Sequence, residues 1–300
     1  MIKKLQLTVA REGVRLDKYL AQECPELSRS YMQKLIGEGY VTVNGRVVKR
    51  SFQLASGDRV SAIIPPSPPL PLAEDIPLNI VYEDSDLLVI DKPAGLIVHP
   101  TPSRPSHTLV NAILARYPHL ADMSSTRPGI VHRLDKNTSG LMVVAKNEAA
   151  QQNLSAQIKA RSVVKRYLVL VAGHLSPERG IIEAPVGRHL RDRKLMAVVS
   201  GGREARTQYR VLRYLDNYTF LEVTPETGRT HQIRVHLAAI GHPVVGDEVY
   251  GVRSPFLGRQ FLHAHQLGFR LPSTGEYVEF SSKLPPDLEL ALMRISEVSQ

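Results

Sequence analysis

Residues 129–140 read GIVHRLDKNTSG, and the apolar run LMVVA follows them at residues 141–145. A short apolar run bounded by Gly140 and Asn147 is typical of a buried strand. Asp135 is therefore expected on the loop just before that strand, between the cations Arg133 and Lys136. Positive charge on both sides favours the ionised form of a carboxylate, which acts as nucleophile or base near neutral pH. A plain polar turn remains the alternative, because Asp and Asn are ordinary turn residues.

Two further segments carry residues suited to binding or catalysis. The tripeptide Lys165-Arg166-Tyr167 opens an apolar stretch, and residues 227–237 read TGRTHQIRVHL. Residues 132–140 resemble the catalytic motif of the RluA-type pseudouridine synthases, and these two segments resemble the other two signatures of that family, in the same order. The resemblance extends from about Val14 to about Ser282 and shows no departure at the three motifs.

This resemblance implies a fold and roles for individual residues. The expected fold is α+β: a catalytic domain built on a mixed, mainly antiparallel β-sheet (the pseudouridine synthase fold) and a small N-terminal α/β RNA-binding domain. Asp135 matches the family's catalytic aspartate, Tyr167 the residue that packs against the flipped base, and Arg234 the ion-pair partner of Asp135. An aromatic face suits base stacking, and a guanidinium fork suits a carboxylate. Arg229 competes with Arg234 for the Asp135 contact; we favour Arg234 and assign Arg229, with Arg133, to RNA.

The implied reaction converts uridine to pseudouridine. It breaks the bond between the base nitrogen and the sugar, turns the base and forms a carbon–carbon bond without redox change. A carboxylate near the anomeric carbon, a pocket for the extruded base and exclusion of water are needed, and no cofactor is expected. We expect no metal site either, because His231 and His236 are five residues apart and would point to different sides of a helix, unlike the four-residue pair of zinc helices.

The composition indicates a globular protein with a polyanionic partner. The chain has 300 residues, 43% of them hydrophobic, and a net charge of +9, and residues 1–62 hold eleven Lys and Arg against six Asp and Glu. Clustered positive charge favours nucleic acid, and no amphipathic Lys-rich helix with aromatic anchors supports a membrane partner. Cys24 is the only cysteine and no run resembles a signal peptide or membrane span, so a reducing cytoplasm fits best. We expect a monomer, because no long amphipathic segment remains for self-association.

The first 62 residues predict two short helices and a small sheet. Apolar residues at helical spacing predict one helix at about 15–20 and a second from Ser28, a possible N-cap, to Gly37. Residues 41–48 predict a hairpin turned by Asn-Gly, and another strand begins near Gly57. This arrangement resembles the S-four-type RNA-binding module, whose helices present cations to RNA phosphates. Four residues are thereby assigned to RNA, although each alone could be an ordinary surface charge: Arg15, Lys18, Arg29 and Lys34.

A proline-rich stretch divides the chain. Five prolines lie within residues 65–71, where neither helix nor sheet can continue. We expect the RNA-binding domain at residues 13–62, the linker at 63–74 and the catalytic domain at 75–290.

In the catalytic domain, the pattern of apolar residues predicts strands and helices around the motifs. Helices are expected at about 109–116 and 149–161, and strands within 80–95 and at about 166–172, 208–214, 218–223, 261–267 and 277–280. Thr230 is expected to cap a helix that continues to Ile240. Residues 188–210 are densely basic and include Gly201 and Gly202, which favours either a mobile loop that clamps RNA or a surface excursion without function.

Together these features predict a two-domain enzyme that isomerises uridines in RNA. Residues 96–100, Leu-Ile-Val-His-Pro, and the N-terminal module resemble the RluD branch of the family, which implies large-subunit (23S) ribosomal RNA as the substrate. A synthase that acts on transfer RNA and a non-catalytic RNA-binding or ribosome-assembly protein are the alternatives.

Overall fold

The computed structural model describes residues 3–10, 12–25, 27, 29–65, 71–101, 104–123 and 127–298. The chain divides into two compact units, residues 1–70 and 71–300. Ser28, the expected cap of the second helix, and residues 66–70 of the expected linker lie outside the described residues.

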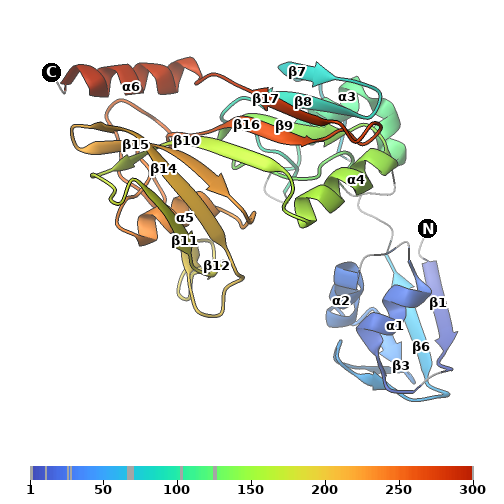
Figure 1. Cartoon of the computed structure of the whole chain (residues 1–300). Helices are drawn as coiled ribbons and strands as arrows, with labels where there is room; N and C mark the ends of the chain where they lie inside the picture. The colour runs from blue at the N-terminus through green and yellow to red at the C-terminus, as the bar shows by residue number, and fades with distance from the viewer. Residues whose placement is uncertain are drawn as a thin grey trace. The chain divides into compact units, whose positions relative to one another are not determined.

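The N-terminal unit is a small antiparallel sheet that packs against two helices (Figure 1). Its elements are β1 (Lys3–Thr8), β2 (Val14–Arg15), α1 (Leu16–Glu23), α2 (Arg29–Gly37), β3 (Val41–Val43), β4 (Arg46–Val47), β5 (Gln53–Leu54) and β6 (Arg59–Ile64). The four-stranded sheet has the order β1-β6-β3-β4, and β2 pairs separately with β5. Asn44 and Gly45 both have positive φ, 51° and 77°, as a type I′ turn requires, so the predicted Asn-Gly hairpin is confirmed.

The apolar residues that have helical spacing in the sequence form the core of this unit. Leu16 and Leu20 of α1 and Met32, Leu35 and Ile36 of α2 are all buried, and they pack against inward-facing residues of β3 and β6. Strand β6 continues to Ile64, two residues into the segment expected to be linker.

The second unit contains the segment expected to be the catalytic domain, is called the catalytic unit below, and is built around one large sheet. Its strands are β7 (Ile80–Glu83), β8 (Leu87–Lys92), β9 (Ser139–Ala145), β10 (Val164–Ala172), β11 (Arg179–Glu183), β12 (Val186–Arg188), β13 (Met196–Val198), β14 (Arg206–Leu215), β15 (Tyr218–Pro225), β16 (Leu262–Arg270) and β17 (Tyr277–Ser281). The helices are α3 (Leu109–Arg116), the 3₁₀ turn η1 (Pro118–Asp122), α4 (Glu148–Lys159), α5 (Gln232–Ala239) and α6 (Pro286–Val298). The nine-stranded sheet has the order β11-β14-β15-β10-β16-β9-β8-β7, with β17 beside β16. Only the β16–β9 pairing among these strands is parallel, so the mixed, mainly antiparallel α+β fold is confirmed.

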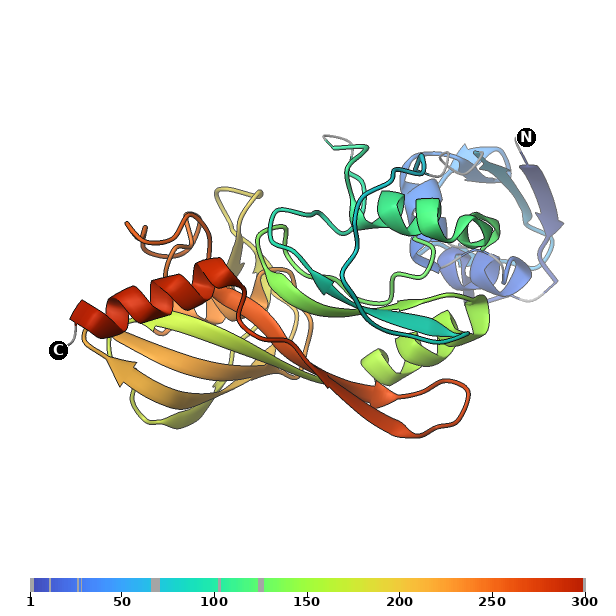
Figure 2. The same cartoon turned by 90° about the horizontal axis from the view of Figure 1, so that it is seen from above.

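Helices cover both faces of this sheet (Figures 1 and 2). Alternate residues of β9 show the two sides: Met142 and Val144 share a buried cluster with α3 and α5, whereas Leu141 and Val143 share another with α4. Leu170 of β10 packs on the second side against α6. A strand buried on both faces is apolar without interruption, which accounts for the run that follows Asp135.

Gly140 lies where β9 meets β16. Its φ is 114°, and a Cβ atom at this position would be 2.3 Å from the backbone oxygen of Ala264. Gly140 and Ala264 are paired in the parallel register of these two strands. Glycine therefore permits the close approach of β16 to the strand that follows the Asp135 loop, and this contact helps to fix where that loop ends.

The structure differs from the sequence-based expectation in two segments of this unit. Helix α6 was not predicted, although Leu288, Ala291 and Ile295 have helical spacing and are buried. The basic stretch 188–210, expected to be a mobile loop that clamps RNA or a surface excursion, contains regular structure: β12 and β13 pair through residues 186–188 and 196–198, and β14 begins at Arg206. Within the described residues, no helix combines the length and apolar character needed to cross a bilayer.

Candidate active site

The three sequence motifs meet at one cavity in the catalytic unit. Its volume is about 500 Å³. The lining comes from residues 131–135 and Thr138 of the loop before β9, from Lys165 and Tyr167 of β10, and from residues 225–234 at the start of α5. The apolar part includes Leu134, Ile233 and Leu262. Segments about 100 residues apart in the chain thus form one concave surface, the usual setting of a small-molecule or base-binding pocket.

Asp135 lies on the wall of this cavity, with 19% of its side chain exposed. Arg234 Nη1 donates a hydrogen bond of 3.0 Å to Asp135 Oδ2. The other oxygen, Oδ1, lies 3.8 Å from His231 Nε2. The structure therefore brings Arg234 to Asp135 directly. In the described residues one carboxylate oxygen is anchored, and the other has no hydrogen bond.

Arg234 is fixed by a second carboxylate. Its Nε and Nη2 atoms donate to the two oxygens of Asp247, at 2.6 and 2.7 Å, and its guanidinium lies 5.0 Å from the ring centroid of Tyr250. Asp247 also accepts the backbone N–H groups of Val249 and Tyr250. Burial opposes the charge of Arg234, but the hydrogen bonds and charge of Asp247 outweigh it and raise the pKa of Arg234. This clamp holds the arginine charged and aimed at Asp135.

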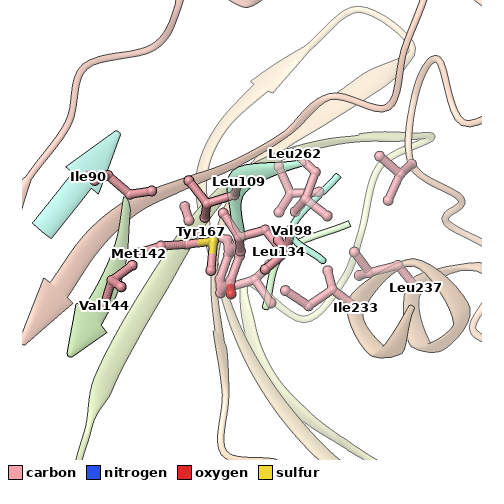
Figure 3. Close-up of a cluster of buried hydrophobic side chains, with 14 of the residues drawn as sticks. Ile90, Val98, Leu109, Leu134, Met142, Val144, Tyr167, Ile233, Leu237 and Leu262 are labelled. Atoms are coloured by element: carbon pink, nitrogen blue, oxygen red, sulfur yellow. The ribbon is translucent and has the colours of Figure 1, made fainter. Parts of the chain in front are cut away.

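Tyr167 forms part of the apolar floor of the site. It is 8% exposed and packs in the main core cluster, with its ring among Leu134, Val98 and Ile233 (Figure 3). Burial and, secondarily, the negative charge of Asp135 raise the pKa of Tyr167. The phenol therefore stays protonated, and the ring offers an apolar face at the cavity.

His231 precedes α5 in a left-handed conformation, with φ 56° and ψ 19°. The expected capping by Thr230 is wrong, because His231 occupies the N-cap position and no side chain caps there. Instead, the Gln232 side chain turns back and its Oε1 accepts the Arg229 N–H at 3.0 Å. His231 Nδ1 lies 2.9 Å from the Tyr250 hydroxyl. Burial lowers the pKa of His231, against the opposing charge of Asp135.

The other cations assigned from the sequence are placed around the cavity without binding Asp135. Arg229 lines the cavity, and its Nε donates to the Glu204 carbonyl at 2.9 Å. Arg133 also lines it, with Nη1 3.3 Å from His99 Nε2. Lys136 is exposed. The hydrogen-bonded cation of Asp135 is thus Arg234 of α5, from a distant part of the chain, and neither of its sequence neighbours.

The four cations assigned to RNA in the N-terminal unit fall into two groups. Arg15 and Arg29 both bind Asp17, whose side chain is fully buried, with shortest contacts of 3.0 and 2.7 Å. Gln33 adds a third hydrogen bond to Asp17, at 2.6 Å. Lys18 is exposed, and Lys34 lies 3.9 Å from Glu38, both of them exposed. All four belong to α1, α2 or the residue before α1.

The histidines of the third motif have separate surroundings. His236 is buried and contacts Thr207 Oγ1 and the Ala184 carbonyl, each at 2.9 Å, whereas His231 faces the cavity. In the described part of the chain, no group of three His, Cys, Asp or Glu residues is placed to hold a metal ion.

Three residues of the site escaped sequence reasoning. Asp247 and Tyr250 lie in the turn-rich segment 241–251, where no periodicity singles them out. Lys92 is 1% exposed, and its Nζ donates to the carbonyls of Pro93, Leu96 and Lys136. Burial lowers the pKa of Lys92 to about 7. A lysine at the end of a buried strand was the available signal, because such a side chain needs partners.

Comparisons with known proteins agree with this geometry. A family model described as RNA pseudouridylate synthase matches residues 86–239, and an S4 domain model matches residues 14–60. The chain is 51% identical to an uncharacterized RNA pseudouridine synthase of Chloroflexus aurantiacus, over 94% of this chain and 90% of that protein. It is 44% identical to ribosomal large subunit pseudouridine synthase D of Nitrosomonas europaea, over 97% and 88%.

Among solved structures, human RNA pseudouridylate synthase domain containing 1 has a TM-score of 0.57 and 34% identity, and the match covers 71% of this chain and 86% of that one. A cavity that joins all three motifs, the family match and these relatives lead to one conclusion. The chain belongs to the RNA pseudouridine synthase family, as an RNA-modifying isomerase with an S4 domain in its N-terminal unit.

Proposed function

We propose that this enzyme isomerises specific uridines of large-subunit ribosomal RNA, with Asp135 as the essential carboxylate. One observation carries the catalytic part: Asp135 lies in the cavity with Oδ2 held by Arg234 and Oδ1 left without a hydrogen bond among the described residues. A carboxylate that is oriented but not saturated can act on the anomeric region of a bound nucleotide. The hydrogen bond from Arg234 holds it in place.

Tyr167 is proposed to pack against the flipped uracil. The ring is rigidly held in the core, and a flipped base needs an apolar face on which to lie. Leu134, Ile233 and Leu262 add apolar surface to the same cavity. Such a lining excludes water from the detached uracil, which would otherwise diffuse away before the carbon–carbon bond forms.

RNA binding is proposed to use both units. At the cavity, Arg133 and Arg229 are the assigned contacts. In the N-terminal unit the assigned contacts are Arg15, Lys18, Arg29 and Lys34, and the S4 domain match supports this assignment. The domains proposed are residues 13–62 and 75–290 with a linker at 63–74, which the division into two compact units at residue 70 supports. We propose a monomer that acts in the cytoplasm on an RNA substrate without a cofactor.

The ribosomal target is supported by the name of the Nitrosomonas europaea relative, ribosomal large subunit pseudouridine synthase D. Transfer RNA is the competing substrate, because a cavity that binds one flipped uridine does not by itself distinguish the RNA that carries it. The N-terminal unit, together with Arg133 and Arg229 at the cavity, is the part that would select the RNA.

The test is to incubate the purified full-length enzyme with unmodified large-subunit ribosomal RNA and, separately, with transfer RNA, in the presence of chelator. Pseudouridine is then mapped at single-nucleotide resolution beside an Asp135→Asn control. Site-specific product in ribosomal RNA that is absent with Asp135→Asn is expected. Product in transfer RNA alone would show that the substrate is transfer RNA and not ribosomal RNA. Equal product with Asp135→Asn would refute the role of Asp135.

A further inference from the structure

The reaction moves one hydrogen for which no residue has been assigned. In uridine, N1 is bonded to the sugar and C5 carries a hydrogen. In pseudouridine, C5 is bonded to the sugar and N1 carries a hydrogen. A base must therefore take the proton from C5 after the new bond forms, and one proton must reach N1, so that the sum of atoms and charge is unchanged.

The position of that base is constrained by Asp135. When the C5 proton leaves, C5 is already bonded to C1′ of the ribose. The proposed role of Asp135 places its carboxylate beside C1′, and the inference here rests on that role. The proton acceptor must therefore lie near Asp135, on the wall of the same cavity, and must have a free lone pair.

Most groups that line the cavity do not meet these conditions. His132 accepts the Val143 N–H through Nε2, at 3.1 Å, so that lone pair is used. Glu226 is bound by Arg206 at 3.1 Å and also by Gln208. Arg133 and Arg234 are cations without a lone pair to offer. Lys165 lines the cavity, but among the described contacts it has none with Asp135.

His231 meets them. Its Nε2 is 3.8 Å from Asp135 Oδ1, its side chain is 27% exposed, and the residue lines the same cavity as Asp135. Nδ1 lies 2.9 Å from the Tyr250 oxygen. That oxygen also accepts the Met196 N–H, at 2.9 Å. A phenol oxygen has two lone pairs and can accept both hydrogens, which leaves Nε2 without one.

We infer that His231 is the base that removes the C5 proton, through Nε2, while Nδ1–H donates to the Tyr250 oxygen. The C5–H bond breaks, its electron pair restores the uracil ring, and the proton forms an Nε2–H bond. The resulting imidazolium then gives a proton to N1, directly or through one water, and becomes neutral again. The hydrogen bond to Tyr250 orients the imidazole ring, as an additional side chain commonly orients a catalytic base.

The surrounding charges suit a base that gains and loses a proton in each turnover. Asp135 and Asp247 favour the imidazolium, whereas Arg234, Arg133 and burial favour the neutral ring. Burial is the largest of these influences and lowers the pKa of His231. The ring is therefore neutral and able to accept a proton near neutral pH.

The test uses RNA transcripts that carry deuterium at C5 of uridine and single-turnover rates of the full-length enzyme. His231→Asn removes the base, and asparagine tolerates the left-handed backbone found at this position. His242→Asn is the matched control: among the described residues its side chain has one hydrogen bond, with the Ala172 carbonyl at 2.9 Å, and His242 is not among the residues that line the cavity. His231→Gly, with added imidazole, tests rescue by an external base.

We expect His231→Asn to lower the single-turnover rate by about 10²- to 10⁴-fold. We also expect deuterium at C5 to slow this variant by a larger factor than it slows the wild-type enzyme. Imidazole should restore part of the rate of His231→Gly. An unchanged rate, or a loss without an increased isotope effect, would show that the proton goes elsewhere, for example to Asp135. Conversion by the wild-type enzyme tests the proposed function, whereas the isotope effect of the variant tests this inference alone.

Discussion

Asp17 in the N-terminal unit and Asp135 in the catalytic unit both bind arginine, and they differ in which carboxylate oxygens remain free for other partners. Asp17 in the N-terminal unit has a fully buried side chain and receives hydrogen bonds from Arg15, Arg29 and Gln33. Asp135 in the catalytic unit has a 19% exposed side chain and, within the described part of the chain, receives one side-chain hydrogen bond, from Arg234. A saturated carboxylate can only organise its neighbours. One that keeps an oxygen free in a cavity can also react.

The difference extends to how each cation is held. At Asp17 the carboxylate is the centre, and two arginines with partly exposed side chains converge on it. At Asp135 the arginine is the centre, because Arg234 is 5% exposed and Asp247 anchors it from the far side. The catalytic unit therefore uses a second acid to position the cation, which leaves the first acid available for chemistry.

Removal of the anchor should have the largest effect. In Asp247→Asn the amide cannot form two charged hydrogen bonds, so Arg234 is left partly uncompensated in the interior. We expect the free energy of unfolding to fall by about 3–5 kcal/mol and the single-turnover rate by about 10²-fold. Urea unfolding and rate measurements check this.

Asp287→Asn is the matched control for the anchor variant. Asp287 also pairs with a buried arginine, Arg259, but its own side chain is 49% exposed, so water can replace the lost interaction. A rate of Asp247→Asn equal to that of the control would show that Arg234 needs no anchor.

A fall in pH should destabilise the catalytic unit before it destabilises the N-terminal unit. Burial lowers the pKa of His99 to about 4 and that of His132 to about 3, from 6.5. The unfolded chain therefore binds more protons than the folded chain below pH 6.5, and each histidine costs the catalytic unit about 1.4 kcal/mol per pH unit down to its folded pKa. Residues 1–62 contain no histidine.

The pKa of Asp17 is lowered: burial opposes this, but the hydrogen bonds from Arg29 and Arg15 outweigh it. A lowered carboxyl pKa gives stability that is lost only as the pH falls below the ordinary value of 3.8. Hydrogen exchange of the full chain between pH 7 and 4 should show protection lost in the catalytic unit first. Equal losses in both units would contradict this difference.

Asp17→Asn should have a smaller effect, confined to the N-terminal unit. The amide keeps one acceptor but loses the charge that holds Arg15 and Arg29, so we expect that unit to lose about 1–3 kcal/mol. Peptide-resolved hydrogen exchange measures this loss. Unchanged protection in α1 and α2 would show that the cluster does not stabilise them.

The smallest effect is expected for Lys18→Ala. Lys18 is exposed, so its loss should leave stability unchanged and remove one phosphate contact. The plot of log K against log salt, whose slope is negative, should then become less steep by about 0.9. Binding measured from low to moderate salt checks this, with the exposed Lys283→Ala of the catalytic unit as a comparison. An unchanged slope would remove Lys18 from the RNA contacts.

Much of the fold followed from local sequence patterns. The continuous apolar run after Gly140 predicted a buried strand, the Asn-Gly pair predicted its hairpin, and the helix at 109–116 has the predicted bounds. These features depend on neighbouring residues, whose chemistry sequence shows directly. Helix α6 was missed, although its buried residues Leu288 and Ile295 had the same kind of spacing.

The site was less accessible to sequence because its contacts cross long separations. Arg234 is 99 positions from Asp135, and the motif resemblance supplied that pairing, not periodicity. Asp247 anchors Arg234 from an irregular turn, which no pattern marks. The left-handed His231, which displaced Thr230 as the cap, depends on Gln232 folding back on the chain. This side chain also donates to the Arg206 carbonyl and to Thr207 Oγ1, and such tertiary hydrogen bonds override local capping preferences.

The most direct test of the central claim compares Asp135→Asn with Asp17→Asn in the same three assays: turnover at saturating RNA, RNA affinity and stability. We predict that Asp135→Asn loses turnover but keeps RNA binding and stability. Asp17→Asn should keep turnover at saturating RNA but lose RNA affinity and stability of the N-terminal unit. If Asp135→Asn instead retained turnover, or lost it only together with its folded structure, the account of Asp135 as the reacting carboxylate would be contradicted.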